Sequence, residues 1–130
     1  MWIFTETGFI SAVAHRDDQR FMMVRARDKQ SLEELALMSQ TEIEYSPNAD
    51  YSWRTVVHKQ DLYQFMEHAI SVADYDNFKN RVTKTRGNRF VTALHHVWEI
   101  MHNVEDEGAR KRWAREAYED ELADEYEPNH

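Results

Sequence analysis

The sequence contains no cysteine, which excludes disulfides, thiolate zinc sites, iron–sulfur clusters and cysteine nucleophiles together. Only three glycines are present, and neither a glycine-rich phosphate loop nor a dinucleotide-binding fingerprint occurs. The nucleophile elbow of hydrolases and the HExxH zinc motif do not occur either. No apolar run approaches the roughly 18 residues that a membrane span requires. We therefore expect no cofactor and no membrane partner.

The remaining composition is that of one folded domain. The chain has 130 residues, of which 42% are hydrophobic, so it can bury a core. Its first residues, Met1–Phe4, have neither a basic leader nor a following apolar stretch, which argues against a secretory signal. We therefore expect a cytoplasmic protein.

The net charge of −8 is concentrated at the C-terminal end. Residues 105–130 contain four basic and ten acidic side chains, a net charge of −6. Residues 1–104 contain 12 basic and 14 acidic side chains, a net charge of −2. This distribution predicts two parts, a domain over 1–104 and an acidic helical or flexible extension over 105–130. The overall negative charge disfavours general binding to nucleic acid.

Hydrophobic patterning predicts an α+β fold. Short apolar or alternating runs predict strands, and spacings of three and four residues predict helices. The expected strands are 2–4, 9–14, 21–27, 42–45 and 51–57, and the expected main helices are 31–39, 61–72 and 89–104. Two ββα units in succession would form an antiparallel sheet of four to five strands covered by the helices, with an extra acidic C-terminal helix.

The helix starts carry capping signals, and the longest helix carries a broad apolar stripe. Ser31 and Glu34 have the spacing of a capping box, and Asp61 has the position of a cap for the next helix. The segment Lys29–Leu32 matches Lys59–Leu62 at an offset of thirty residues. The match indicates either a true internal repeat or the residue preferences that all helix N-termini share. In the helix over 89–104 we expect a buried stripe made of Phe90, Leu94, Val97, Met101 and Val104, widened by Ala93 and Ile100.

Five basic residues lie within eleven positions of the chain. They are Lys79, Arg81, Lys84, Arg86 and Arg89. Basic residues interleaved with aromatics such as Phe78 and Phe90 can follow a phosphate backbone. The same cluster can instead contact the chain's own acidic tail or a partner protein, and we rank that interpretation first. Three aromatic residues of the tail, Trp113, Tyr118 and Tyr126, complete the candidate partner-binding set.

Two other groups of residues have a chemical interpretation. His95, Glu99 and His102 share one helix face at the spacing of metal ligands. They lie about 120° to 180° from the apolar stripe, which favours a face in contact with water, so we expect no metal. Asp74, Asp76 and Asn77 could serve acid–base chemistry, but helix capping explains them more simply. We therefore expect no catalytic residue in either group.

Four short segments are distinctive: Arg25-Ala26-Arg27-Asp28, Ala49-Asp50-Tyr51, Asp74-Tyr75-Asp76-Asn77-Phe78-Lys79 and His96-Val97-Trp98-Glu99-Ile100-Met101. Together they resemble a family of small uncharacterised proteins of bacteria and actinobacteriophages, over about residues 1 to 104. The resemblance implies no activity and assigns no functional residues. It implies a setting of small accessory genes whose products bind and redirect one host protein.

These observations favour a non-enzymatic interaction protein, encoded by a phage, that binds a host protein or protein complex and inhibits or modifies it. Two alternatives stay open. One is a nucleic-acid-associated protein that uses Lys79–Arg89, and the other is a metal-assisted hydrolase that uses the exposed histidines.

Overall fold

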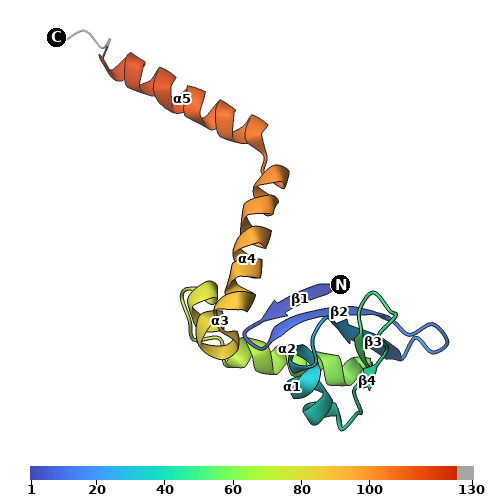
Figure 1. The fold of residues 1–130 in the computed structure, drawn as a ribbon. Helices are drawn as coiled ribbons and strands as arrows, with labels where there is room; N and C mark the ends of the chain where they lie inside the picture. Colours follow the sequence, from blue (N-terminus) through green and yellow to red (C-terminus); the bar gives the residue numbers. More distant parts are fainter. Residues whose placement is uncertain (126–130) are drawn as a thin grey trace. The chain divides into compact units, whose positions relative to one another are not determined.

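In the computed structural model, which describes residues 1–125, the chain folds around a five-stranded antiparallel sheet (Figure 1). The strand order is β1-β2-β3-β5-β4. The strands are β1 (Trp2–Thr5), β2 (Gly8–Ala14), β3 (Phe21–Ala26), β4 (Glu44–Tyr45) and β5 (Trp53–His58). The predicted α+β class and the antiparallel sheet are confirmed. The hairpins β2–β3 and β4–β5 are each followed by a helix, as the prediction of two ββα units requires.

Within residues 1–125, five α-helices and one short 3₁₀ helix accompany the sheet. They are α1 (Gln30–Ser39), α2 (Lys59–Ser71), α3 (Phe78–Arg86), α4 (Asn88–Ile100), the 3₁₀ helix η1 (Met101–Val104) and α5 (Glu107–Glu125). None of the helices described between residues 1 and 125 has the length and hydropathy of a membrane span.

The chain divides into two compact units. The first comprises residues 1–95 and contains the whole sheet, and the second begins at His96. The boundary between them falls inside α4, so the two halves of this helix belong to different units.

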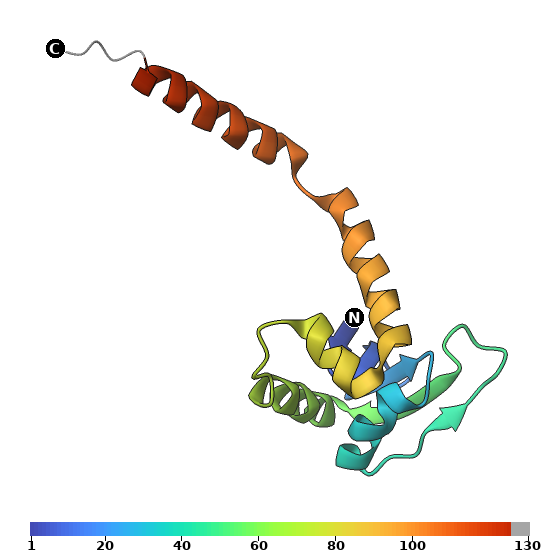
Figure 2. The same cartoon turned by 60° about the vertical axis from the view of Figure 1, so that its left-hand side comes forward.

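The core of the first unit lies between one face of the sheet and the helices α1 and α2. Figures 1 and 2 both show these two helices on the same side of the sheet. Strand residues of alternating position point toward the helices, and the helices contribute residues at helical spacing. The fully buried side chains include Ile10, Val24, Val57, Leu32, Leu35 and Phe65. The opposite face of the sheet carries the other residues of each strand.

The capping pattern at α1 differs from the predicted one. Asp28, not Ser31, accepts the backbone N–H of the first turn: its Oδ1 lies 3.3 Å from Ser31 N. Ser31 is buried, and its hydroxyl oxygen accepts the backbone N–H of Phe9 at 3.2 Å. Glu34 pairs with His68 at 3.3 Å. The local capping box is absent because these side chains bond to β2 and α2.

The N-cap of α2 is also a different residue from the predicted one. His58 is the N-cap, and its Nδ1 accepts the N–H of Gln60 at 3.0 Å. Asp61, the predicted cap, lies at the third helical position and accepts the N–H of His58 at 3.2 Å. The two residues form a capping box that satisfies two of the free N–H groups at this helix start.

The turn between β2 and β3 contains a carboxylate with a perturbed pKa. Arg20 donates to Asp18 from its side chain at 2.7 Å and 3.0 Å, and from its backbone N–H at 3.0 Å. These hydrogen bonds favour the charged form and lower the pKa of Asp18 to about 2.

We expect the carboxyl carbon of Asp18 to titrate near pH 2 in an NMR pH series. The unfolded-state pKa is about 3.9, so the turn contributes stability above that pH and loses it as the pH falls toward 2. In Arg20→Gln the midpoint should rise toward the unfolded value. A midpoint unchanged by that substitution would show that Arg20 is not the cause of the low pKa.

Candidate partner-binding surface

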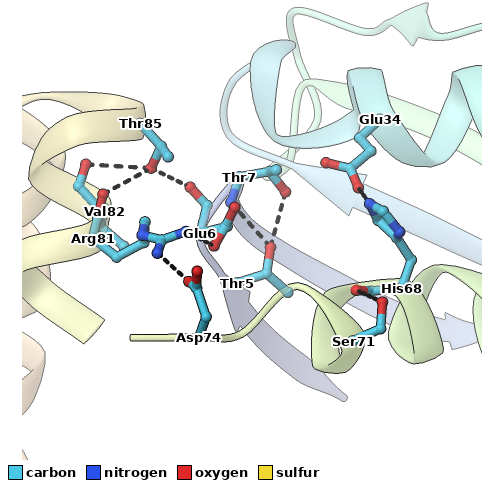
Figure 3. Close-up of polar contacts among 10 residues, drawn as sticks. All are labelled: Thr5, Glu6, Thr7, Glu34, His68, Ser71, Asp74, Arg81, Val82 and Thr85. Carbon is cyan, nitrogen blue, oxygen red and sulfur yellow. Dashed lines mark hydrogen bonds and ion pairs between the residues drawn. The ribbon is translucent and has the colours of Figure 1, made fainter. Parts of the chain in front are cut away.

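The helix α3, which carries most of the predicted basic cluster, is held against the β1–β2 turn (Figure 3). Arg81 reaches Glu6 at 3.2 Å and also pairs with Asp74. Thr85 donates its hydroxyl to the carbonyl oxygen of Glu6. The hydrogen bond that Arg81 donates to Asp74, together with the charges of Asp74 and Glu6, raises the pKa of Arg81, so this side chain stays charged. Arg81 therefore anchors α3 to the sheet.

Arg86, at the other end of α3, is a second anchor. Its side chain is only 6% exposed. It donates to the carbonyl oxygen of Thr7 at 2.8 Å and to Ser31 Oγ at 3.1 Å, and it pairs with Asp28. The guanidinium also lies 4.4 Å from the ring centroid of Phe90. Because these contacts enclose it, Arg86 is not accessible to a partner in this conformation.

The basic cluster therefore contains both residues that are held within the domain and residues that are exposed. Arg81 and Arg86 bind residues of their own domain, and Lys79 is half-buried. Lys84 and Arg89 are exposed. The segment contributes fewer accessible charges than its composition suggests, which weakens the interpretation of it as a track for a phosphate backbone.

The acidic group before α3 has a structural role. Asn77 is the N-cap of the helix, and its Oδ1 accepts the N–H of Asn80 at 3.0 Å. Asp74 is the carboxylate that holds Arg81. The predicted capping role is confirmed for Asn77, and the pairing of Asp74 with an arginine was not predicted.

A Ser–His–Glu set lies beside this region and contains the residue types of a hydrolytic triad. Glu34 Oε1 contacts His68 Nε2 at 3.3 Å (Figure 3). Ser71 Oγ, however, donates to the backbone carbonyl of His68 at 2.8 Å and not to the imidazole. In a catalytic triad the serine hydroxyl is hydrogen-bonded to the imidazole that acts as the base, so this arrangement is not that of a triad. The adjoining cavity, of about 100 Å³, has room for only a few water molecules.

The histidines of the long helix are exposed, as their position on the helix predicts. In the second unit, His96 lies 3.7 Å from Glu99, and His102 lies 3.6 Å from Glu105. The ring of Trp98 meets that of His102 edge to face at 4.7 Å. Across the described residues, no group of three histidine or acidic side chains is arranged to hold a metal ion.

The predicted buried stripe of the long helix is buried only at its start. Leu94 is buried and Phe90 is half-buried, in agreement with the prediction. From Val97 onward the prediction is wrong. Between 39% and 73% of the surface of each following stripe residue is exposed; these residues are Val97, Ile100, Met101 and Val104. We call these four side chains the apolar stripe. An amphipathic pattern predicts that another surface covers the apolar face of the helix. Within residues 1–125, no surface covers these four side chains fully.

Helix α5 exposes two further members of the predicted set. Trp113 and Tyr118 are both exposed, and Tyr126 lies outside the described residues. At about 100° per residue the two aromatics are about 140° apart around the helix, so they do not form one continuous face. The basic side chains of α5 lie in its first half, between Arg110 and Arg115, and its C-terminal half, from Glu116 to Glu125, is acidic. No residue of α5 is buried.

Comparisons with protein-family models, with curated proteins and with solved structures gave no match to this chain.

Proposed function

We propose that this chain is a non-enzymatic interaction protein, phage-encoded and cytoplasmic, that binds a host protein and inhibits or modifies it. The observation that carries the proposal is the exposure of the apolar stripe, Val97, Ile100, Met101 and Val104. Exposed apolar surface of this kind, at regular helical spacing, is typical of a helix that docks in a groove of another protein. The resemblance of residues 1–104 to small phage proteins supports the setting.

The chemistry of the stripe suits a protein partner. Its positions follow the i, i+3, i+4, i+7 pattern by which an amphipathic helix anchors itself in an apolar groove. Met101 adds a flexible, polarisable side chain that adapts to irregular surfaces. Trp113 and Tyr118, on the following helix, are residue types enriched among interface hot spots.

The nucleic-acid alternative that uses Lys79–Arg89 is less well supported. Arg81 and Arg86 are held by carboxylates of their own domain, so a phosphate backbone would have to displace those contacts. Removal of either arginine would disturb the anchoring of α3, whereas the side chains of the apolar stripe are exposed. The stripe is therefore the feature that a test should address.

The test compares two doubly substituted chains. In Ile100→Glu/Met101→Glu the apolar stripe is interrupted. The control is Leu37→Glu/Ile70→Glu, which places the same charges at exposed apolar positions of α1 and α2. Both variants should keep the wild-type urea midpoint, because substitutions at exposed positions change stability little. We expect host protein retained by the wild type and the control to be lost by the stripe variant. With the purified partner, isothermal titration should show at least about a tenfold weaker Kd.

Two outcomes would contradict the proposal. Equal retention of the partner by the stripe variant would place binding on another surface. A wild-type dimer that the stripe substitutions convert into a monomer, seen by sedimentation equilibrium, would mean that a second copy of the chain covers the stripe.

A further inference from the structure

The face of the sheet opposite α1 and α2 carries a row of side chains from different strands. Strand pairing, and not their position in the sequence, brings them together. The register pairs Trp2 of β1 with Ser11 of β2, Ser11 with Arg25 of β3, and Arg25 with Arg54 of β5. Residues directly paired across an antiparallel sheet lie on the same face, so these four side chains, together with Glu44 of β4, which is paired with Arg54, cross the sheet in one line. Ile10, Val24 and other neighbours in the strands point to the buried side.

Two arginines in this row face each other, and the carboxylate opposite Arg54, that of Glu44 in β4, forms no ion pair with either of them within residues 1–125. Arg25 and Arg54 are paired across β3 and β5. Arg25 donates to Ser11 Oγ at 2.9 Å, and Arg54 donates to the carbonyl oxygen of Tyr51 at 3.2 Å. Within residues 1–125 neither guanidinium forms an ion pair, and Arg25 Nε is buried without a hydrogen-bond acceptor. Like charges directly opposite each other destabilise a sheet, and an anion bound between them would reverse that effect.

The ring of Tyr51 packs against Arg25 and against a third arginine, Arg27, which itself pairs with Asp50. Tyr51 is buried, although it lies in the loop before β5. The guanidinium carbon of Arg25 lies 4.7 Å from its ring centroid, and that of Arg27 lies 4.4 Å from it. Stacking on an aromatic ring limits the conformations of each guanidinium, so less entropy is lost when an anion binds.

An exposed aromatic ring stands at the end of the same row. Trp2 is 70% exposed. Its ring meets that of Phe9 at 5.8 Å and nearly perpendicular, and Phe9 in turn stacks on Phe4 at 4.5 Å. Two strand spacings of about 4.8 Å separate Trp2 from Arg25. The row therefore places an accessible ring on the same face of the sheet as the two arginines, two strands away from Arg25.

We propose that this face of the sheet binds single-stranded nucleic acid, with a phosphate between Arg25 and Arg54 and a base stacked on Trp2. A guanidinium fork fits phosphate oxygens, and an exposed indole accepts an unstacked base. A duplex would not present a base face to Trp2, so the occupant is a single strand. Residues 1–95 carry 12 basic and 13 acidic side chains, so the unit that holds this site is nearly neutral. The negative charge of the chain lies mainly from His96 onward.

The test uses the full chain and a fluorescein-labelled oligothymidylate or oligouridylate of about 12 nucleotides, followed by fluorescence anisotropy. Binding should weaken about 2.6-fold between about 50 mM and about 200 mM salt, as one neutralised phosphate on a single strand requires. Trp2→Ala should weaken binding about tenfold, and Trp2→Phe should restore most of it because a stacking ring remains. Arg54→Gln should weaken binding and reduce the magnitude of the slope of log K against log salt toward zero.

Arg89→Gln is the matched control, since it removes one exposed positive charge of the same unit but lies on another element. Urea midpoints of all variants establish that each is folded. Equal weakening by Arg89→Gln and Arg54→Gln would overturn the proposal, because binding would then follow charge alone. An unchanged affinity in Trp2→Ala, tighter binding of a duplex, equal competition by an acidic peptide, or no binding of either oligonucleotide at low salt would also overturn it.

Discussion

Phe65→Ala should lower the free energy of unfolding by about 4 kcal/mol, the largest loss expected from a single truncation in this fold. The side chain is fully buried at the centre of α2, within the core cluster that includes Leu32, Leu35 and Val57. Its removal forfeits the transfer free energy of the ring and leaves a cavity that rigid neighbours on the sheet cannot fill. Urea unfolding followed by circular dichroism measures the loss.

Tyr63→Ala provides the control for Phe65→Ala. Tyr63 is an exposed aromatic residue of the same helix, so its truncation should change stability by less than about 0.5 kcal/mol. If the two variants lost equal stability, the face of α2 that packs on the sheet would be assigned wrongly, and the alternation of the strands would have to be reconsidered with it.

The elements of the first unit could be predicted because each has a local signal. Alternation over 21–27 placed Val24 on one face and Arg25 on the other, and the structure places them so. Helical spacing predicts one apolar face of α2, made of Leu62, Phe65, Met66, Ala69 and Ile70. Leu62 and Phe65 are buried as predicted, whereas Ile70, near the end of the helix, is exposed. Such signals depend on neighbours within a few residues, and they hold wherever the local pattern and the tertiary fold agree.

The same kind of signal was misleading in the second half of α4. The apolar stripe continues the helical period of Phe90 and Leu94, and periodicity alone predicts that all of it is buried. Burial depends on whether another surface covers the face, and that surface can belong to another molecule. The error is therefore informative, since it marks the residues on which the proposed function rests.

Roles that depend on distant partners could not be predicted. Counting charges identified Arg81 and Arg86 but not Glu6 and Asp28, which lie 75 and 58 positions away in the sequence and hold them. In the same way, no sequence pattern brings Arg25 opposite Arg54. The strand register does so, and it becomes known only when the order of the strands is known.

Gly8→Ala should be nearly as damaging as the loss of Phe65, because this glycine lies where α3, α1 and the β1–β2 turn meet. Its φ is +145°, a value that side-chain-bearing residues rarely adopt. An added Cβ would lie 2.9 Å from Ser31 Cβ, and closer still to Ser31 Oγ and the guanidinium of Arg86. Ser31 is buried and Arg86 is enclosed, so neither moves without breaking hydrogen bonds.

The chain contains a matched control for Gly8→Ala. Gly87 has a φ of +83°, but an added Cβ there would meet no atom within 4 Å. Gly87→Ala therefore measures backbone strain alone, about 2 kcal/mol, whereas Gly8→Ala adds a steric clash and should cost about 4 kcal/mol in urea unfolding. A double-mutant cycle with Asp28→Asn identifies the contact that is lost. Asp28→Asn should cost less in the Gly8→Ala background than in the wild type, because the displaced Arg86 no longer pairs with Asp28. Equal losses for the two glycine variants would show that Gly8 is needed only for its backbone conformation, and that α3 does not pack closely on the turn.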